Sequence, residues 1–363
     1  MGETRVKMEV MPVPKRYILL SLLLALTFLL IGGPALEAHS DMPSGQYFTL
    51  LDENNNVIHQ TGMQVHKGDE YISADNSHYK VIAIDGTTAR CAYQGQEKMP
   101  ALDFSTKKNA WILGGTRLAP VQANKKPTIA IYHTHSDESY VQGDGTESVN
   151  GKGGIYDIGQ TLSERLQKLG FNVEYNRNNH NPHDVNAYSR SRKTAASLLK
   201  QQPDVILDVH RDAVPASQYQ AEVAGKEVTK VKLVVGSQNP NMKTNLEFAK
   251  RIKSAMDNKA PGLSNGIFIG KGDFNQDLSP RSMLIEVGSH TNQKSDAEEG
   301  VAVFADTLPA LLGVNTVSAD NAPAAKPMTK ESQGAGTTIL IILVVVAAAA
   351  GGFYLLNRGG TSK

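Results

Sequence analysis

Residues 128–312 alternate between short apolar runs and longer amphipathic runs, and this alternation limits the folds that the chain can adopt. Five apolar runs are typical of strands: 128–133, 171–176, 204–210, 230–236 and 282–288. Four segments carry apolar residues at helical spacing: 155–169, 186–202, 241–256 and 295–312. Strands separated by such helices predict an α/β fold with an open, mixed or mostly parallel sheet and helices on both faces.

Glycine and proline mark several expected helix ends. Gly170 follows the first helical segment and is expected to end it. Pro203 stops the second segment, and Pro309 is expected to kink the last one.

Residues 41–120 lack apolar residues at helical spacing and predict a small β-rich domain ahead of the α/β part. Residues 47–62 and 78–95 both suggest two strands joined by a polar turn, with Asp85 and Gly86 forming the second turn. Residues 119–127 are expected to link this domain to a catalytic domain over 128–313. Residues 314–336 are rich in Ala, Pro, Ser and Gly and predict a flexible linker.

The two ends of the chain each carry an uncharged apolar run. Residues 17–31 follow Lys7, Lys15 and Arg16, which is typical of a signal peptide or signal anchor within 1–40. Residues 337–356 match the ~20 apolar residues needed to cross a bilayer. Basic residues flank both runs on their outer sides, so both ends are expected in the cytoplasm and the rest on the extracytoplasmic side of the cell membrane.

The charge balance disfavours one class of partner. The chain has 37 Lys and Arg against 36 Asp and Glu, a formal net charge of +1. Nucleic-acid binding usually needs a clustered basic face, so no nucleic-acid partner is expected. Cys91 is the single cysteine, which excludes an intrachain disulfide.

Three of the predicted strands end in ionisable residues: His133, His210 and Glu286. In an open α/β sheet, reactive groups gather beyond the carboxyl ends of the strands. These three side chains are therefore expected at one rim of the sheet.

The residues after the first strand suggest a metal site. A catalytic zinc takes three protein ligands, often two His and one Glu. His135 and Glu138 form an H-x-x-E pair, and His210 is the expected third ligand. His133 shares a strand face with His135, so either can be the ligand; His135 is favoured because it completes the pair, with His133 as alternative or supporting group. Glu286 is expected to be the general base.

Neighbouring residues have expected supporting roles. Asp208 or Asp212 can accept a hydrogen bond from His210, as a carboxylate does for many metal-bound histidines. Arg211 is predicted to pair with a substrate carboxylate or a developing oxyanion. His180 and His183 lie in a loop rich in Pro and Asn and are poor candidates for a second metal site.

Four motifs in order resemble the stage II sporulation protein P family, the membrane-anchored peptidoglycan hydrolases of endospore-forming Firmicutes. They are "IYHTHSDESY" (131–140), the Tyr-Ser-Arg-Ser-Arg run at 188–192, "DVHRDA" (208–213) and "FNQDLSPRSMLIEVGSHTN" (274–292). The resemblance covers about residues 128–312. Phe274 stands where the family usually has Tyr, and Glu138 falls sooner after its His than in ordinary cell-wall amidases.

The resemblance implies a Zn²⁺-dependent fold like that of the N-acetylmuramoyl-L-alanine amidases. It implies amidase cleavage between the lactyl group of muramic acid and L-Ala, and endopeptidase cleavage of stem peptides, at the sporulation septum during engulfment. Stage II sporulation proteins D and M are the implied partners. Carried onto this chain, the metal residues are His133 or His135, Glu138 and His210, the catalytic carboxylate is Glu286, and Asn275 and Gln276 line the groove.

Two other functions fit parts of the pattern. A carboxypeptidase or poly-glutamate hydrolase can use the same H-x-x-E and distant His. A non-catalytic wall-binding scaffold would require the loss of a ligand or of the base, and every candidate residue is present.

Overall fold

The computed structural model describes residues 41–102, 112–113, 116–117 and 126–312. The apolar runs 17–31 and 337–356 and the predicted linker 314–336 lie outside these residues. Within the described ranges, no helix combines the length and the apolar character that a membrane span needs.

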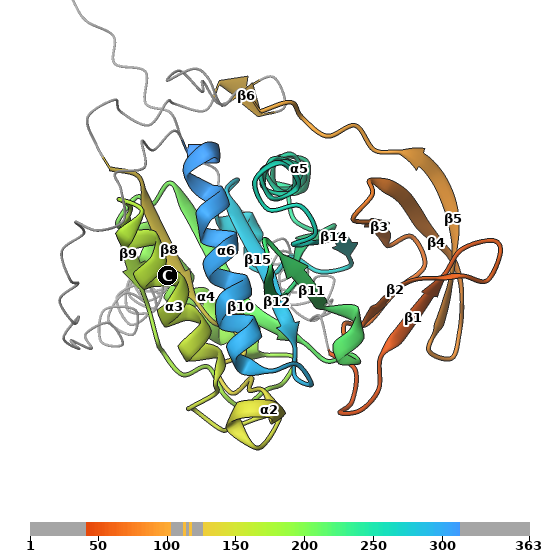
Figure 1. Cartoon of the computed structure of the whole chain (residues 1–363), viewed down its shortest axis with the longest axis horizontal. Coiled ribbons are helices and arrows are strands. Elements are labelled where there is room, and N and C mark those ends of the chain that lie inside the picture. The colour runs from red at the N-terminus through yellow and green to blue at the C-terminus, as the bar shows by residue number, and fades with distance from the viewer. Residues whose placement is uncertain (1–40, 103–111, 114–115, 118–125, 313–363) are drawn as a thin grey trace, which may run out of the picture. The chain divides into compact units, whose positions relative to one another are not determined.

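One mixed sheet of eleven strands organises the described chain, in the order β2-β1-β5-β4-β3-β14-β13-β15-β10-β8-β9 (Figure 1). Four neighbouring strands are parallel: β9 (Asn172–Tyr175), β8 (Thr128–Tyr132), β10 (Val205–Asp212) and β15 (Ser282–Ser289). The next two run antiparallel to them: β13 (Val231–Gly236) and β14 (Ser264–Gly270). The predicted α/β fold with an open mixed sheet is confirmed.

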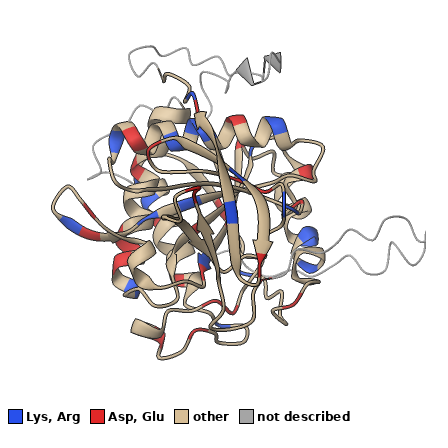
Figure 2. Ribbon diagram, turned by 90° about the vertical axis from the view of Figure 1, so that its right-hand side faces the viewer, with Lys and Arg blue, Asp and Glu red and all other residues tan. Residues whose placement is uncertain are grey.

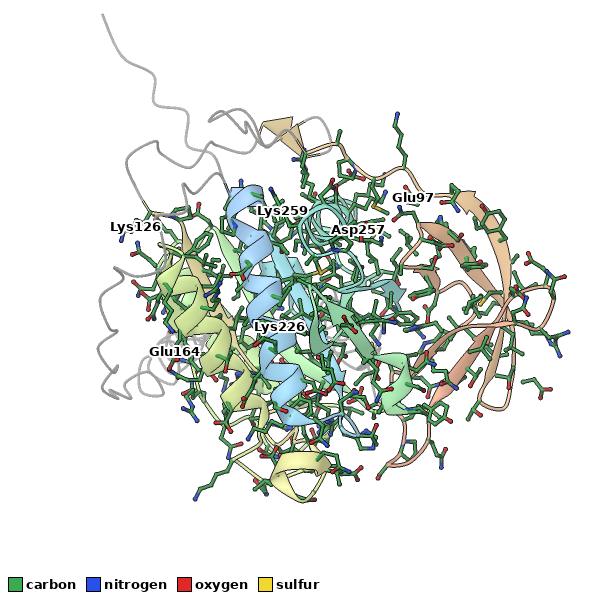
Figure 3. The ribbon with its side chains drawn as sticks, in the orientation of Figure 1. Glu97, Lys126, Glu164, Lys226, Asp257 and Lys259 are labelled. Carbon is green, nitrogen blue, oxygen red and sulfur yellow. The ribbon has the colours of Figure 1, made fainter. Side chains whose placement is uncertain are left out.

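Helices cover both faces of this sheet, as predicted. One face packs against α3 (Ile155–Lys168), α5 (Met242–Lys259) and α6 (Lys294–Leu312). In Figure 1, α3 and α6 lie in front of the strands and α5 is seen end-on. The opposite face packs against α4 (Ala187–Leu199). Side chains fill the space between the helices and the sheet (Figure 3). Gly170 has φ +95° just after α3, as expected of a terminating glycine, and α6 runs through Pro309.

Burial on both faces explains why the central strands are continuous apolar runs rather than alternating ones. All five residues of β8 are buried. Ile131 points into the core under α3 and α6, whereas Tyr132 packs on the α4 side with Leu198.

The N-terminal β-rich part extends the same sheet. Its strands are β1 (Phe48–Leu51), β2 (Val57–Thr61), β3 (Glu70–Ile72), β4 (Ser77–Asp85) and β5 (Thr88–Gln96). β3 pairs antiparallel with β14, with Ile72 opposite Ile267. Leu50 and Val81 share a buried cluster with Leu284 of β15. The sheet and the core are thus continuous between this part and the α/β part.

Some elements escaped the sequence analysis. These are β3, β14, the hairpin of β11 (Gln220–Val223) and β12 (Lys226–Thr229), the pair β6 (Ile112–Leu113) and β7 (Thr116–Arg117), and the short helices α2 (Val141–Asp144), η1 (Ala216–Gln218) and η2 (Gln276–Leu278). In β14, Asn265 and Gly266 shorten the apolar run to three residues, below the length of a recognisable strand.

Charges of both signs alternate over the described residues in Figure 2, without a basic stripe in that view. The labelled Glu164 and Lys226 in Figure 3 are exposed side chains of α3 and β12.

Gly266 allows the close approach between β14 and β3, and its substitution provides a test of this junction. Gly266 has φ +82°, and a Cβ there would lie 2.3 Å from the Ile72 carbonyl oxygen. We expect Gly266→Ala to lower the free energy of unfolding by about 3 kcal/mol, because left-handed strain adds to a clash with backbone. Urea denaturation of the purified protein measures the loss.

Gly86→Ala is the matched control. Gly86 also has positive φ (+57°), but nothing lies within 4 Å of its Cβ position. It should cost only about 1 kcal/mol, from strain alone. Equal losses for the two variants would show that the junction is not closely packed.

Candidate metal centre

The ends of three parallel strands form the site, as the sequence predicts. β8, β10 and β15 are neighbours in the sheet, and His210 lies directly opposite Glu286 in the register of β10 and β15. The chain leaves β8 at Tyr132 and turns through buried residues 133–139 across the same edge. His135, Glu138, His210 and Glu286 all line one pocket there.

Glu138 lies between two imidazoles. Its Oε1 is 3.2 Å from His135 Nδ1 and 3.4 Å from His210 Nδ1. Ligand atoms at ~2.0–2.1 Å from a tetrahedral zinc are about 3.3–3.4 Å apart. The separations from Glu138 to each of the two imidazoles therefore match those between ligands of one zinc ion, and the candidate ligand is His135 rather than His133.

Further contacts fix the orientation of these side chains. Arg211 donates its backbone N–H to Glu138 Oε2 at 3.0 Å. His210 Nε2 lies 2.9 Å from Asp208 Oδ1, off the line of a good hydrogen bond. Thr134 donates its backbone N–H to the same Asp208 oxygen at 2.8 Å. A carboxylate behind a ligand imidazole is the usual outer partner in metal sites, and the structure selects Asp208 for this position.

The charges around His210 suit a cation. Burial acts to lower the pKa of His210, but the carboxylates of Asp208 and Glu138 outweigh it and hold that pKa well above its usual range. His210, His135 and Arg211 in turn hold the pKa of Glu138 well below its usual range despite burial. A positive charge is thus favoured between these carboxylates, and a metal ion binding there would displace a proton.

His133 lies outside this group, which corrects the expectation that it shares a face with His135. Its Nδ1 lies 2.7 Å from the Val209 carbonyl oxygen, and its Nε2 lies 2.9 Å from the Tyr175 hydroxyl. Burial lowers the pKa of His133 to about 4, so the ring is neutral. β8 has ended at Tyr132, so the alternation of a straight strand does not apply at 133–135.

Glu286 faces the pocket with one carboxyl oxygen uncommitted. The side chain is buried, and its Oε2 has no hydrogen-bond partner among the described residues. Burial raises the pKa of Glu286 to about 8; the negative charge of Asp212 adds to this rise, and Lys232 and His210 oppose it. A carboxyl with such a pKa can accept and return a proton near neutral pH.

Asp212 belongs to a buried network beside Glu286 rather than to His210. Lys232 is fully buried and donates to Asp212 Oδ2 and, at 3.0 Å, to Thr61 Oγ1. Gly62 donates its backbone N–H to Asp212 Oδ1 at 2.7 Å. The end of β2 is thereby tied to the site.

The predicted roles of Arg211, Asn275 and Gln276 differ from their observed contacts. The Arg211 guanidinium donates to the carbonyl oxygens of Ser139 (3.3 Å) and Glu147 (2.9 Å), so it holds the loop after Glu138; contact with a substrate stays a prediction. Asn275 and Gln276 are not among the residues that line this pocket, and their assignment to a substrate groove stays a prediction.

The side chains of Asn275 and Gln276 are buried and stabilise the chain. Asn275 Nδ2 donates to the Tyr188 carbonyl at 3.0 Å. Gln276 Nε2 donates to the Val234 carbonyl at 2.8 Å, and its Oε1 accepts from Gly236 N–H at 2.9 Å. Gln276 thus satisfies two backbone groups of β13 and Asn275 one of α4, and these contacts support a role of both amides in folding.

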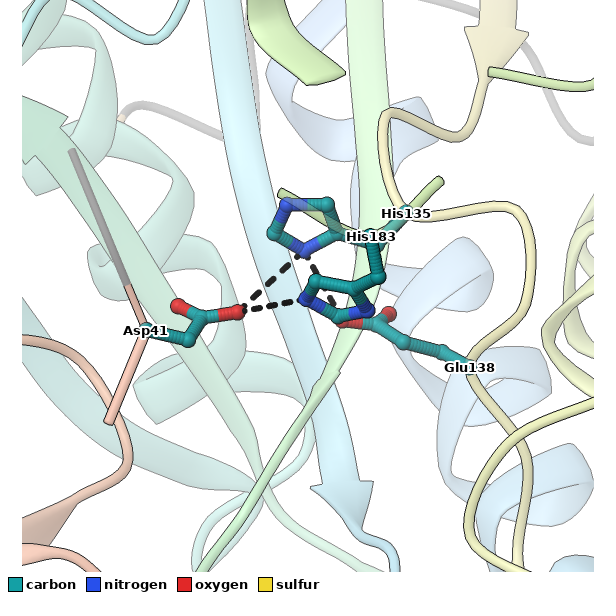
Figure 4. Close-up of side chains that lie close together, drawn as sticks. All are labelled: Asp41, His135, Glu138 and His183. Carbon is teal, nitrogen blue, oxygen red and sulfur yellow. Dashed lines mark hydrogen bonds and ion pairs between the residues drawn. The ribbon is translucent and has the colours of Figure 1, made fainter. Parts of the chain in front are cut away.

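Two residues that the sequence analysis did not assign to the site lie beside it. Asp41, His135, Glu138 and His183 each place one ligand atom within 4.8 Å of the others (Figure 4). His183 stacks on His135 with ring centroids 3.8 Å apart. His180 is not part of the group, since its ring nitrogens lie 2.7 Å from the His133 carbonyl and 2.8 Å from Thr194 Oγ1. In the sequence, His183 is only a histidine in a loop rich in Pro and Asn, which is weak evidence for a metal site. No sequence motif includes Asp41.

Comparisons with known proteins agree with the motifs. The family model of Stage II sporulation protein P (SpoIIP) matches residues 48–309. Stage II sporulation protein P of Bacillus subtilis (strain 168) is 27% identical over 202 residues, and the match covers 50% of this chain and 50% of that protein. The chain thus matches about half the length of this curated relative.

Solved structures show weaker likeness. The N-acetylmuramyl-L-alanine amidase Ami1 from Mycobacterium smegmatis is 16% identical with a TM-score of 0.33, covering 51% of this chain and 94% of that one. The catalytic domain of CwlV, an N-acetylmuramoyl-L-alanine amidase from Bacillus (Paenibacillus) polymyxa var. colistinus, is 15% identical with a TM-score of 0.34, covering 52% and 99%. TM-scores of this size establish neither a shared fold nor a shared activity.

The two histidines after β8 make different predictions for metal content. His135→Ala should weaken metal binding by more than the roughly 10–100-fold that loss of an outer partner costs, because it removes a ligand atom. His133→Gln should keep one metal ion per chain, because its ring nitrogens bind protein groups. Elemental analysis of the purified variants measures this, and a metal-loaded His135→Ala protein together with a metal-free His133→Gln protein would reverse the assignment.

The environment of Glu286 predicts a pH effect on the stability of the chelator-treated protein. The pKa of Glu286 is about 8 in the fold and near 4.5 in the unfolded chain, so the folded state holds the extra proton between these values. Stability should therefore fall as pH rises from about 4.5 to 8, relative to Glu286→Gln. Denaturant midpoints of both proteins across this range measure the difference, and parallel curves would contradict it.

Proposed function

The chain belongs to the stage II sporulation protein P family, and we propose that it is a zinc-dependent peptidoglycan hydrolase of the N-acetylmuramoyl-L-alanine amidase class. One observation supports the proposal above the others. Glu138 lies at ligand spacing between His135 and His210, and Glu286 lines the same pocket with a free carboxyl oxygen.

The division of work among the residues follows from their contacts. His135, Glu138 and His210 would hold the ion. When bound, zinc supplies Lewis acidity, which makes water a nucleophile near neutral pH and polarises an amide carbonyl. Asp208 and the Arg211 backbone N–H keep the ligand side chains in place.

Glu286 moves the proton. Its carboxylate would accept a proton from the attacking water and pass it to the leaving amide nitrogen, as a general base and then a general acid. Its buried position supports this role, because a carboxyl with a raised pKa both takes and returns a proton readily. Lys232 and Asp212 lie beside it; the negative charge of Asp212 raises the pKa of Glu286, and the positive charge of Lys232 lowers it.

For the substrate, we propose the amide between the lactyl group of muramic acid and L-Ala, and in addition cross-linked stem peptides. Membership of the sporulation family supports a role at the septal wall during engulfment, with stage II sporulation proteins D and M as partners. We further propose that the apolar run 337–356, with or without 17–31, anchors this part of the chain outside the cell membrane, where the cell wall lies.

A carboxypeptidase or poly-glutamate hydrolase is the second candidate, because the two histidines and Glu138 serve such reactions equally well. Product analysis of digested peptidoglycan separates the two. An amidase leaves unsubstituted glycan chains and releases whole stem peptides. Shortened stem peptides that stay attached to glycan would instead identify a carboxypeptidase.

Glu286→Gln tests the mechanism while keeping the size of the buried side chain. We expect kcat on purified peptidoglycan to fall by about 10²–10⁴-fold, the usual contribution of a general base. Zinc content should stay at one ion per chain, because Glu286 is not among the ligands. Glu164→Gln, an exposed carboxylate of α3, is the matched control and should keep full activity. Retained activity in Glu286→Gln would remove this residue from the mechanism.

A further inference from the structure

We propose that Asp41 is a fourth, displaceable ligand of the metal centre, and that it closes the site together with Gly62 and Met63. This inference rests on the proposed metal-dependent function and adds a latent state to it. It assigns a role to a residue that lies some 90 positions before the H-x-x-E pair.

The first support is the spacing of the donor atoms. Asp41 Oδ2 lies 3.4 Å from His135 Nδ1, and Glu138 Oε1 lies 3.2 Å from the same nitrogen. Both distances match the ~3.3–3.4 Å separation of two ligand atoms on one tetrahedral zinc. Figure 4 shows the Asp41 carboxylate directed at His135 from the side opposite Glu138.

His183 holds Asp41 in this position. His183 Nε2 lies 2.9 Å from Asp41 Oδ2, and its Nδ1 lies 3.2 Å from Asp137 Oδ1. Asp137 is buried and accepts a hydrogen bond from Ser148 Oγ at 2.6 Å. The imidazole therefore links Asp41 to a fixed carboxylate, which makes His183 a positioning residue rather than a metal ligand in this proposal.

The second support is the space left in the pocket. The cavity bounded by Asp41, Gly62, Met63 and the ligand residues has a volume of about 10 Å³. This is about the space that one water needs, and it is far too small for a sugar or a peptide. We call Asp41, Gly62 and Met63 the cover of the site. In this proposal, peptidoglycan reaches the metal centre only after the cover has moved.

The cover is attached to the site by specific contacts. Met42 donates its N–H to the Gly62 carbonyl at 2.7 Å, and Asp41 forms an isolated bridge with Met63. Gly62 in turn donates to Asp212 at 2.7 Å. A Cβ on Gly62 would lie 2.8 Å from the Ala213 Cβ, so this approach needs glycine.

Exposure shows which ligand can leave. The Asp41 side chain is 29% exposed, whereas those of His135 and Glu138 are 6% and 2% exposed. A catalytic zinc keeps a position open for water, and four protein donors are typical of closed, structural sites. Asp41 at the mouth would therefore occupy the position that catalysis needs, and its withdrawal would open that position.

Asp41→Asn and the control Asp85→Asn in the full chain test the proposal by anion binding. Asp85 is an exposed aspartate at the end of β4. The proteins are loaded with Co²⁺ in place of zinc and titrated with azide, which competes for the open position and changes the visible spectrum. If the closed state makes up nine-tenths or more of the wild-type protein, Asp41→Asn should bind azide at least about tenfold more tightly. Asp85→Asn should bind it as the wild type does.

A second variant controls for the possibility that the amide introduced by Asp41→Asn itself changes azide binding. His183→Gln leaves Asp41 unchanged but removes its fixed partner, and it should also tighten azide binding while keeping one Co²⁺ per chain. Both variants should hydrolyse peptidoglycan faster than the wild type.

The outcomes separate this proposal from the proposed function. Unchanged azide affinity in both cobalt-loaded variants would overturn the role of Asp41, even if Glu286→Gln remains inactive as expected. Loss of cobalt in His183→Gln would also overturn it, since His183 would then be a ligand. Failure of the wild-type chain to take up any metal would instead refute the metal-dependent function, and this inference with it.

Discussion

The buried ion pair between Lys232 and Asp212 is the interaction on which the arrangement of the site depends. Both side chains are essentially inaccessible to solvent, and removing two such charges from water costs several kcal/mol per ion unless the geometry is well satisfied. Here Asp212 also accepts hydrogen bonds from the Gly62 N–H and the Tyr219 hydroxyl, and Lys232 donates to Thr61. These bonds join β10, β13 and the end of β2 at one point.

The buried ion pair also lies next to the residues with proposed catalytic and metal-binding roles. Lys232 lies opposite Glu286 in the register of β13 and β15, and Glu286 lies opposite His210 in the register of β15 and β10. One row across three strands therefore carries a cation, the candidate base and a candidate ligand. The same junction holds Gly62 against the site, so the N-terminal strands are part of the pocket wall and not an independent module.

Much of this could be predicted from local sequence. Helices α3 to α6 follow from apolar residues at helical spacing. Strands β8, β10, β13 and β15 follow from continuous apolar runs, because a strand buried on both faces is apolar along most of its length. His135, Glu138, His210 and Glu286 follow from their positions at strand ends. Asn275 and Gln276 could not be interpreted in the same way, since a motif does not say whether its amides face a ligand or a neighbouring strand.

The sequence by itself determined the α/β order, the family and the donor types, because each of these depends on residues close together in the chain. Only the tertiary structure decided which histidine joins the group. That choice depends on the turn after Tyr132, which sends His133 to Tyr175 and His135 to Glu138. Only the tertiary structure also brought Asp41 to the site. A contact between residues about 90 positions apart is made by the sheet that joins them and leaves no periodic signal in the sequence.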